Sequence, residues 1–249
     1  MEARLLHWES SAVGDDEVTL PDNSEISVDD CRVATRKVAH ALEWLRTFFT
    51  GASGTLHREY FACQWWSEPE LLITTDASPW GLGATLHPRD HLVAVLSDPL
   101  TEDDCSRFKF KIGDAAGQAT WEALAELVAT RTWQDRWYGL PWNIAMRGDS
   151  KAALGALGKL RSVRSPAINA IAREMSLDLA GSPHKISVRE HLPGKLNILA
   201  DFLSRRHQPG AAVLPPWDLG DVEWSPVQQR DDGWWKTWKR SSASSSGEQ

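Results

Sequence analysis

The stretch from Leu71 to Leu86 reads LLITTDASPWGLGATL, and the rest of the sequence can be interpreted outward from it. Residues 71–75 form an apolar, β-branched run typical of a buried strand, and the run ends at a single carboxylate, Asp76. Pro79 and the glycines after it predict a tight turn into a second strand. A carboxylate at the end of a central strand can be held rigidly while it faces a cleft. Asp76 is therefore a candidate functional residue, and a plain turn aspartate is the alternative.

Strand and helix patterns alternate after this hairpin. Residues 91–96 predict a third strand, which completes an antiparallel meander, and residues 97–119 indicate a polar connection. Apolar residues at helical spacing predict the clearest helix over residues 120–138, with Thr120 as its N-cap. The pattern then predicts strands at 142–146 and 185–188 and helices at 151–157, from 166 onward and at 197–205. This order predicts an α/β fold with a five-stranded mixed sheet, three antiparallel strands plus two parallel, flanked by helices.

Composition and charge indicate a globular chain with distinctive ends. The 249 residues, 42% hydrophobic and 24% charged, suffice for one sizeable core with appendages. The net charge of −7 comes from residues 1–30, where nine acids face one arginine, so the remainder is near neutral. We expect no membrane span, because no apolar run approaches about 20 residues, and no secretory signal, because the acidic N-terminus lacks the apolar core of a signal peptide. Three widely spaced cysteines favour a reduced intracellular compartment, cytoplasmic or nuclear, without structural zinc.

The sequence divides into four expected segments. Residues 1–27 form an acidic leader that we expect to be flexible, and residues 28–68 form a helical segment whose helix ends at Gly51. Residues 69–207 form the main domain. Residues 208–249 are rich in Pro, Trp, Ser and Gly, and we interpret them as a tail that is docked in part at most.

Four carboxylates occupy positions that the predicted fold would bring together. Asp76 and Asp149 each end an apolar strand, Glu122 lies in the first turn of the clearest helix, and Asp201 lies one turn into the last helix. Functional groups gather beyond the carboxyl ends of adjacent parallel strands. Such a cluster needs cations, because like charges raise one another's pKa. Hard oxygen ligands select Mg²⁺, with Mn²⁺ as the alternative, and two ions about 4 Å apart suit phosphodiester hydrolysis.

Each acid also has a plain structural interpretation. Asp149 and Ser150 are common helix caps, and a glutamate such as Glu122 is favoured near a helix N-terminus by the helix dipole. Glu126, one turn later, is interpreted as a solvated helix residue and not as a ligand. The order Asp, Glu, Asp, Asp on strand, helix, strand, helix favours a functional site, because it is hard to reach by chance.

The last predicted helix and the loop before it carry the most specific motif. Residues 191–205 read HLPGKLNILADFLSR and match every fixed position of the retrotransposon pattern His-x-Pro-Gly-x-x-Asn-x-x-Ala-Asp-x-Leu-Ser-Arg. Three shorter and weaker motifs, TDAS at 75–78, TWEALA at 120–125 and GDS at 148–150, accompany it. With these motifs, residues 69–207 resemble the type 1 ribonuclease H domain of retroelement reverse transcriptases. More loosely, residues 28–66 resemble the thumb and connection region that precedes that domain.

The resemblance implies an activity and a role for each motif residue. The metal ligands would be Asp76, Glu122, Asp149 and Asp201. His191 would be a mobile histidine that assists proton transfer and product release, and Ser150 and Asn197 would be supporting residues. The implied reaction is two-metal hydrolysis of the RNA strand of an RNA/DNA hybrid, leaving a 3′-hydroxyl. The implied partner is a reverse transcriptase polymerase domain, in cis or in trans.

Substrate binding has a weaker signal. Residues 150–172 contain no acid and four basic residues, Lys151, Lys159, Arg161 and Arg164. These side chains could follow a phosphate backbone or belong to an ordinary solvated loop. Only residues 158–165 separate the two predicted helices, so the basic handle of some cellular relatives has no counterpart here. We therefore expect an attached polymerase to help in holding the hybrid.

Other functions compete with an active nuclease. The main alternative is a catalytically silent domain of the same fold that acts as a structural tether or nucleic-acid-binding module, but the presence of all four acids favours activity. A transposase or integrase nuclease would place its glutamate last, whereas Glu122 comes second. A proofreading exonuclease would carry Asp-x-Glu on the first strand, where this chain has Asp-Ala-Ser at 76–78.

Overall fold

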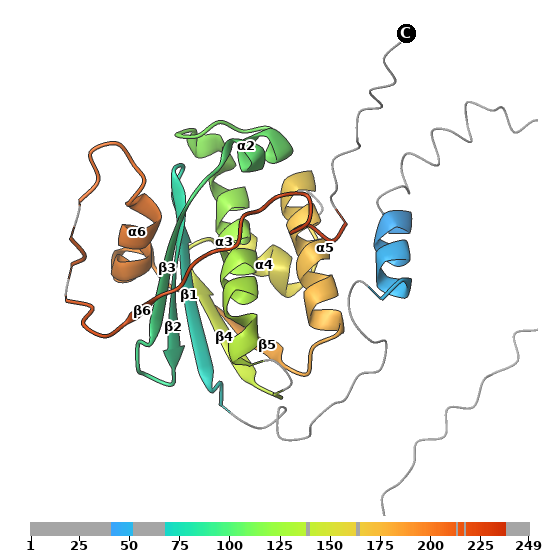
Figure 1. The fold of residues 1–249 in the computed structure, drawn as a ribbon, viewed down its shortest axis with the longest axis horizontal. Helices are drawn as coiled ribbons and strands as arrows, with labels where there is room; N and C mark the ends of the chain where they lie inside the picture. Colours follow the sequence, from blue (N-terminus) through green and yellow to red (C-terminus); the bar gives the residue numbers. More distant parts are fainter. Residues whose placement is uncertain are drawn as a thin grey trace, which may run out of the picture. The chain divides into compact units, whose positions relative to one another are not determined.

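A computed structural model describes residues 41–51, 68–137, 140–162, 165–212, 214–216 and 218–237, and its main body is a mixed sheet with helices on both faces (Figure 1). The strands lie in the order β5-β4-β1-β2-β3-β6. They are β1 (Leu71–Ala77), β2 (Gly81–Pro88), β3 (Ala94–Pro99), β4 (Asn143–Gly148), β5 (Lys185–His191) and β6 (Glu223–Trp224). The expected α/β class is confirmed. The difference is β6, a two-residue strand that pairs in parallel with β3 and was not expected.

The central strand β1 determines where Asp76 lies. Antiparallel pairing with β2 puts Asp76 opposite Gly83, and parallel pairing with β4 runs from Leu71 beside Ile144 to Thr74 beside Arg147. Because β1 and β4 run in the same direction, the residues at their carboxyl ends lie at the same edge of the sheet.

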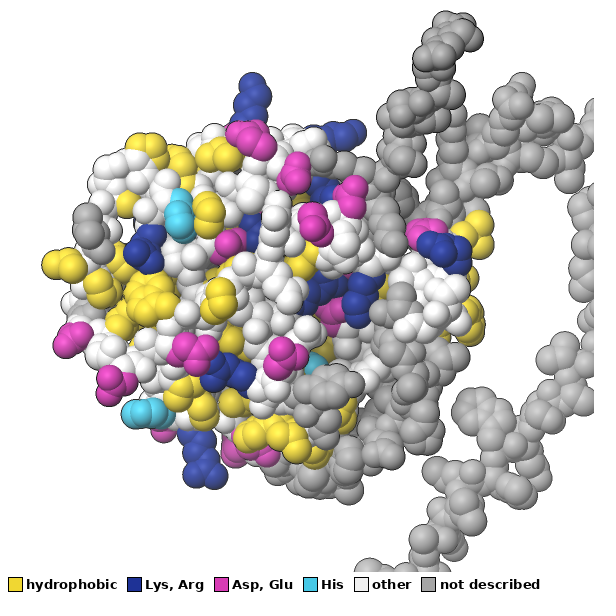
Figure 2. Space-filling view, viewed as in Figure 1, with side chains coloured by type: hydrophobic (Ala, Val, Ile, Leu, Met, Phe, Trp, Pro, Cys, Tyr) yellow, Lys and Arg dark blue, Asp and Glu magenta, His cyan; other side chains and the backbone are white. Residues whose placement is uncertain are grey.

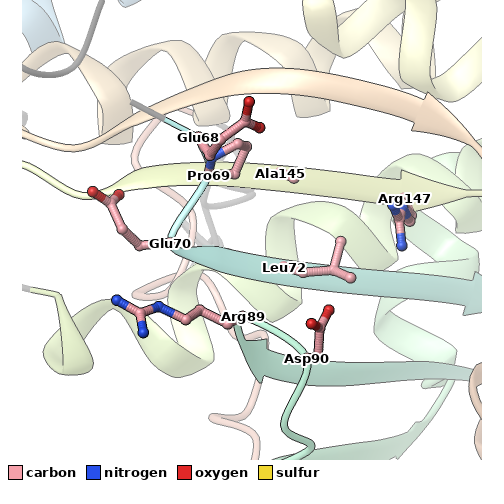
Figure 3. A pocket seen from close by; sticks show the side chains of 8 residues that line it. All are labelled: Glu68, Pro69, Glu70, Leu72, Arg89, Asp90, Ala145 and Arg147. Carbon is pink, nitrogen blue, oxygen red and sulfur yellow. The ribbon is translucent and has the colours of Figure 1, made fainter. Parts of the chain in front are cut away.

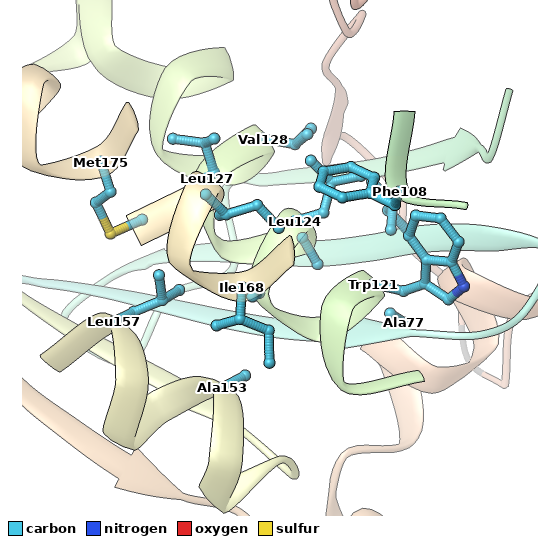
Figure 4. Packing of buried hydrophobic residues seen from close by; sticks show 14 of the residues in the cluster. Ala77, Phe108, Trp121, Leu124, Leu127, Val128, Ala153, Leu157, Ile168 and Met175 are labelled. Atoms are coloured by element: carbon cyan, nitrogen blue, oxygen red, sulfur yellow. The ribbon is translucent and has the colours of Figure 1, made fainter. Parts of the chain in front are cut away.

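Helices cover the two faces of the sheet unequally. On one face lie α3 (Gln118–Trp133), α4 (Lys151–Gly158) and α5 (Pro166–Ala180), and on the other lies α6 (Ile198–Arg205) (Figure 1). The sheet, α4 and α5 surround α3, so most of its residues are buried, including the polar Thr120, Glu122, Glu126 and Thr130. Figure 4 shows the resulting core, in which the Trp121 ring of α3 packs edge-to-face against the Phe108 ring.

On the opposite face, α6 approaches the sheet closely at a glycine. A Cβ on Gly83 of β2 would collide with the Ala200 carbonyl oxygen and the Ser204 amide nitrogen of α6. The missing side chain therefore allows α6 to lie against β2. This contact brings α6 within hydrogen-bonding reach of the end of β1.

Several element boundaries differ from those predicted. The expected polar connection contains α2 (Glu102–Phe108), which is defined by a capping box between Thr101 and Asp104 and not by an apolar repeat. α3 begins at Gln118, so Thr120 is a buried residue within the helix and not its N-cap. Strand β3 lies three residues later than expected, and β5 continues through His191, which was predicted to begin a loop.

Part of the expected C-terminal tail is docked on the main domain. Residues 218–237 include β6 and then cross α3 to reach α5 (Figure 1). The Trp235 side chain is fully buried in the main core, and the Arg230 guanidinium is buried against Asp98 and Asp104. The docked part of the expected tail therefore includes these twenty residues. Trp217 and Trp238 lie outside the described residues.

The described residues include only part of the expected N-terminal segments. Residues 41–49 are helical, and Gly51 follows with a φ of 81°, in agreement with a helix that ends there. The acidic leader, residues 28–40 and residues 52–67 lie outside the described ranges. Within those ranges, every helix is too short or too polar to cross a membrane.

Candidate metal centre

Three of the four predicted carboxylates meet at one edge of the sheet. Asp76 is the penultimate residue of β1, Asp149 directly follows β4, and Glu122 reaches the same point from α3. One oxygen from each carboxylate lies within 4.8 Å of the others. Asp76 and Glu122 are each only 3% exposed, and Asp149 is half-buried. We call these three residues the acid triad.

Two residues of the last motif position the Asp76 carboxylate. The Ser204 hydroxyl donates to Asp76 Oδ2 at 2.7 Å. The Asn197 side-chain amide donates to the Thr75 carbonyl oxygen at 2.9 Å and lies 3.4 Å from Asp76 Oδ1. Asn197, which was predicted as a supporting residue, thus contacts the Asp76 carboxylate. Ser204 was not singled out from the sequence, although it is the fixed serine near the end of the same motif.

Hydrogen bonds from α3 and from β1 hold the Glu122 carboxylate in place. The Gln118 side-chain amide donates to Glu122 Oε1 at 2.7 Å and to the Ala77 carbonyl oxygen at 2.5 Å. The Ala77 amide nitrogen donates to the same Glu122 oxygen at 3.3 Å. Gln118 lies one turn before Glu122 on α3, in the part of the chain predicted to be a connection, which is why sequence reasoning missed it.

Glu126 is not the solvated helix residue that was predicted. Its side chain is buried and forms an ion pair with Arg189 of β5. The prediction failed because α3 is enclosed on nearly all sides, so its helical spacing does not reveal an exposed face. Glu126 is satisfied by this arginine and does not belong to the acid triad.

Burial and mutual repulsion perturb the acid triad. Burial raises the pKa of Asp76 to about 7, the hydrogen bond from Ser204 opposes this rise, and the negative charges of Asp149 and Asp201 add to it. Burial also raises the pKa of Glu122 well above its ordinary value, with further contributions from Asp76 and Asp149. Without a cation, the triad therefore does not carry its full negative charge at neutral pH.

The fourth carboxylate, Asp201, lies nearby but outside the acid triad. It is close enough to raise the pKa of Asp76, yet its Oδ1 accepts a 2.6 Å hydrogen bond from Arg205 Nε one turn along α6. Both side chains are partly exposed. A pocket of about 520 Å³ beside α6 is lined by Asp201, Phe202 and Arg205, among others.

The remaining predicted residues surround the acid triad or lie away from it. His191 is exposed at the end of β5, in register with Gly148, the residue before Asp149. The Ser150 side chain accepts from the Ala153 amide nitrogen at 3.3 Å and so caps α4. Lys151, Lys159 and Arg161 are exposed along and after α4, and Arg164 lies outside the described residues.

Among the described residues, the acid triad is the one group of three or more potential metal-ligating side chains that comes together. On the face shown in Figure 2, basic and acidic side chains are interspersed and do not separate by sign. The pocket in Figure 3, about 540 Å³, lies at the other end of β1 from Asp76. It is lined by residues of both charges, including Glu70, Arg89 and Arg147.

The acid triad fits divalent metal ions by its donor chemistry. All its ligand atoms are carboxylate oxygens, which suit hard cations such as Mg²⁺ and Mn²⁺. The two raised pKa values provide a second argument, because a bound cation would stabilise the ionised forms that burial disfavours. Asp76, Glu122 and Asp149 could therefore hold metal.

Comparisons with known proteins return likenesses of structure alone. No protein-family model matches the sequence, and neither does any curated protein. An RNase H1 from the halophilic archaeon Halobacterium salinarum NRC-1 has 19% identity and a TM-score of 0.38, over 53% of this chain and 92% of that one. An RNase H1 isolated from compost by a metagenomic approach has 16% identity and a TM-score of 0.41, over 56% and 96%. The N-terminal RNase H domain of a Mycobacterium tuberculosis protein, fused to maltose-binding protein, has 16% identity and a TM-score of 0.41. This match covers 53% of this chain and 94% of that one.

Proposed function

We propose that residues 69–207 form a ribonuclease H-like nuclease that hydrolyses the RNA strand of RNA/DNA hybrids with divalent metal ions. The observation that carries this proposal is the acid triad. Three carboxylates from β1, α3 and the end of β4, far apart in sequence, meet within 4.8 Å of one another in a largely buried position. The match of residues 191–205 to the retrotransposon motif supports it, because Asn197 and Ser204 of that motif both contact Asp76.

The chemistry follows from what each side chain can do. When bound, two divalent cations would supply charge neutralisation and activation of water for in-line attack on the phosphodiester. Asp76, Glu122 and Asp149 would hold the ions, and Asn197, Ser204 and Gln118 would orient the carboxylates. His191, exposed at the end of β5, would be the mobile histidine that assists proton transfer and product release.

The wider context is a second part of the proposal. The motif of residues 191–205 is that of a retroelement, so we propose that the domain acts as the ribonuclease H part of a reverse transcriptase. The short connection between α4 and α5 supports this assignment, because the described basic residues along and after α4, which are Lys151, Lys159 and Arg161, would offer only a few contacts to phosphates. A polymerase domain, in cis or in trans, would supply the remaining contacts with the hybrid.

A hybrid-cleavage assay tests the activity. A fluorescent RNA/DNA hybrid is incubated with the full chain and Mg²⁺, with Asp149→Asn as the site variant and the exposed Asp135→Asn as the charge-matched control. We expect the wild type and the control to cleave the RNA strand. The cleavage rate of the site variant should fall by more than about 100-fold, because the loss of a metal ligand should exceed the loss of a residue that only hydrogen-bonds a ligand. No cleavage by the wild type, or equal cleavage by Asp149→Asn, would remove the proposal.

A catalytically silent domain of the same fold is the second candidate. The observation that favours it is the pairing of Asp201 with Arg205, which leaves the carboxylate outside the acid triad. In that case the wild type would bind the hybrid without cutting it, at any Mg²⁺ or Mn²⁺ concentration. A gel-shift measurement made on the same samples as the cleavage assay distinguishes the two candidates.

A further inference from the structure

The helix that carries Asp201 is fixed relative to the acid triad. Hydrogen bonds join both ends of α6 to β1, because Asn197 donates to the Thr75 carbonyl oxygen and Ser204 donates to Asp76. The Ser204 carbonyl oxygen in turn accepts from the Ser78 hydroxyl at 2.7 Å. Asp201 lies between these anchors and three residues from Ser204, so it shares the side of the helix that faces the triad. Its side-chain rotamer, and not a movement of α6, therefore determines whether its carboxylate reaches the triad.

Arg205 is the residue that holds this rotamer. Its guanidinium bonds Asp201 Oδ1 at 2.6 Å, with 52% of the arginine side chain and 39% of the aspartate side chain exposed. The pKa of Arg205 is raised by this hydrogen bond first, and the charges of Asp76 and Asp149 add to the effect. The guanidinium thus lies close enough to the triad to be attracted by it, as a bound cation would be.

The ion pair can open at small cost. Exposed ion pairs at i,i+4 on a helix are weak, because water solvates both partners well. The pocket of about 520 Å³ that both side chains line offers room for them to rotate. A divalent cation at the acid triad carries twice the charge of Arg205 and would compete with it for Asp201.

We propose that Arg205 is a positioning residue that holds Asp201 apart from the acid triad in the metal-free protein and yields it when divalent metal binds. The proposal rests on the proposed function, since it assumes that the triad takes metal. Asp201 is then the last carboxylate to join the centre, and Arg205 weakens metal binding by competing for it. The Arg205 guanidinium, once released, faces solvent beside the site.

A double-mutant cycle on metal affinity tests the proposal without relying on activity. Binding of Mn²⁺ alone is measured by calorimetry for the full-length wild type, Arg205→Met, Asp201→Asn and the double variant. Methionine keeps the apolar stem and removes the guanidinium. We expect Arg205→Met to tighten Mn²⁺ binding about two- to fivefold, the factor that an exposed ion pair is worth. In the Asp201→Asn background, the same substitution should give a smaller gain, because it then removes only the attraction of the guanidinium for the triad and not the competition for Asp201.

The control addresses the simple loss of a positive charge. Arg206, the next residue, stacks its guanidinium 4.5 Å from the centroid of the Trp224 ring, and no described hydrogen bond or ion pair joins it to Asp201. Arg206→Met should leave the Mn²⁺ affinity unchanged.

Each outcome decides between two statements. If Arg205→Met raised Mn²⁺ affinity equally with and without Asp201, or did not raise it at all, the role of Arg205 would be overturned. The proposed function would still stand if the wild type bound metal and cleaved the hybrid. A folded wild type that binds no Mn²⁺ would overturn the proposed function, and this inference with it.

Discussion

Two groups of acids in this protein differ in whether arginine side chains pair with them. On the helical side, Asp104 and Asp98 are paired with Arg230, and Glu174 and Asp178 are paired with Arg131. At the edge of the sheet, Asp76, Glu122 and Asp149 each place an oxygen within 4.8 Å of the others, and no ion pair among the described residues reaches them.

The difference separates acids that hold elements together from acids that could bind metal. The protein neutralises buried carboxylates with guanidinium groups where the acids serve to hold elements together, as Arg230 does between β3, α2 and the C-terminal residues. It leaves the acid triad with neutral donors only, from Ser204, Asn197 and Gln118. Buried like charges without a counter-ion cost stability, so their retention indicates a site for cations.

The largest expected effect on stability comes from breaking one of the arginine-paired groups. Arg230→Met should lower the free energy of unfolding by about 3–5 kcal/mol, because it leaves Asp98 and Asp104 without their cation in a buried position. Urea unfolding followed by circular dichroism measures this change. Arg136→Met, which breaks the exposed pair with Glu223, serves as the control and should cost less than about 1 kcal/mol. Equal effects of the two variants would contradict the structural role of Arg230.

A substitution in the acid triad is expected to raise the stability of the metal-free protein. Asp76→Asn should stabilise the metal-free protein at pH 7 by about 1–3 kcal/mol, because it removes a buried charge that its neighbours oppose. The same variant should lose most of the rise in melting temperature that Mg²⁺ gives the wild type. Thermal unfolding with EDTA and with Mg²⁺ measures both effects, and Asp135→Asn is the control for a change of charge at the surface. A wild type whose melting temperature ignores Mg²⁺ would argue against the metal centre.

The raised pKa of Asp76 also fixes the direction of a pH effect. In the folded protein this pKa is about 7, compared with about 3.9 in an unfolded chain, so the folded state binds the proton more tightly. The contribution of Asp76 to stability is therefore fully present below about pH 4 and is lost as the pH rises towards 7. The difference in stability between Asp76→Asn and the metal-free wild type should grow across this interval. A difference that stays constant from pH 4 to pH 7 would place the Asp76 pKa in its ordinary range.

Much of this organisation follows from the sequence, and the parts that do not have physical reasons. The strand that ends at Asp76 and the helix capped by Ser165 were predictable because a short apolar run and a cap with a following proline are local signals. The α2 helix was missed because its capping box acts over four residues without an apolar repeat. The docking of Trp235 and Arg230 depends on contacts more than a hundred residues apart in sequence, which no local pattern encodes.

The candidate site shows the same limit. Sequence order could select Asp76, Glu122 and Asp149 as candidates, and only the fold could place their oxygens together. The ion pair that keeps Asp201 apart is a matter of rotamer, and Gln118 becomes a partner of Glu122 only because α3 begins two residues before the predicted cap. Both features arise from side-chain geometry that a list of motif residues does not contain.

The smallest expected effect concerns the hydroxyl that orients Asp76. Ser204→Ala removes the donor to Asp76 Oδ2, which helps to keep that carboxylate ionised, so Mn²⁺ affinity at pH 7 should fall about tenfold, or about 1.4 kcal/mol. Ser97→Ala is the matched control, because its hydroxyl also anchors α6, through the Leu203 carbonyl oxygen at 2.7 Å, and makes no described contact with the triad. If the two alanine variants lowered Mn²⁺ affinity equally, the effect would belong to the seating of α6. If only Ser204→Ala lowered Mn²⁺ affinity, then neutral hydrogen-bond donors, and not guanidinium groups, would position the acid triad for metal binding.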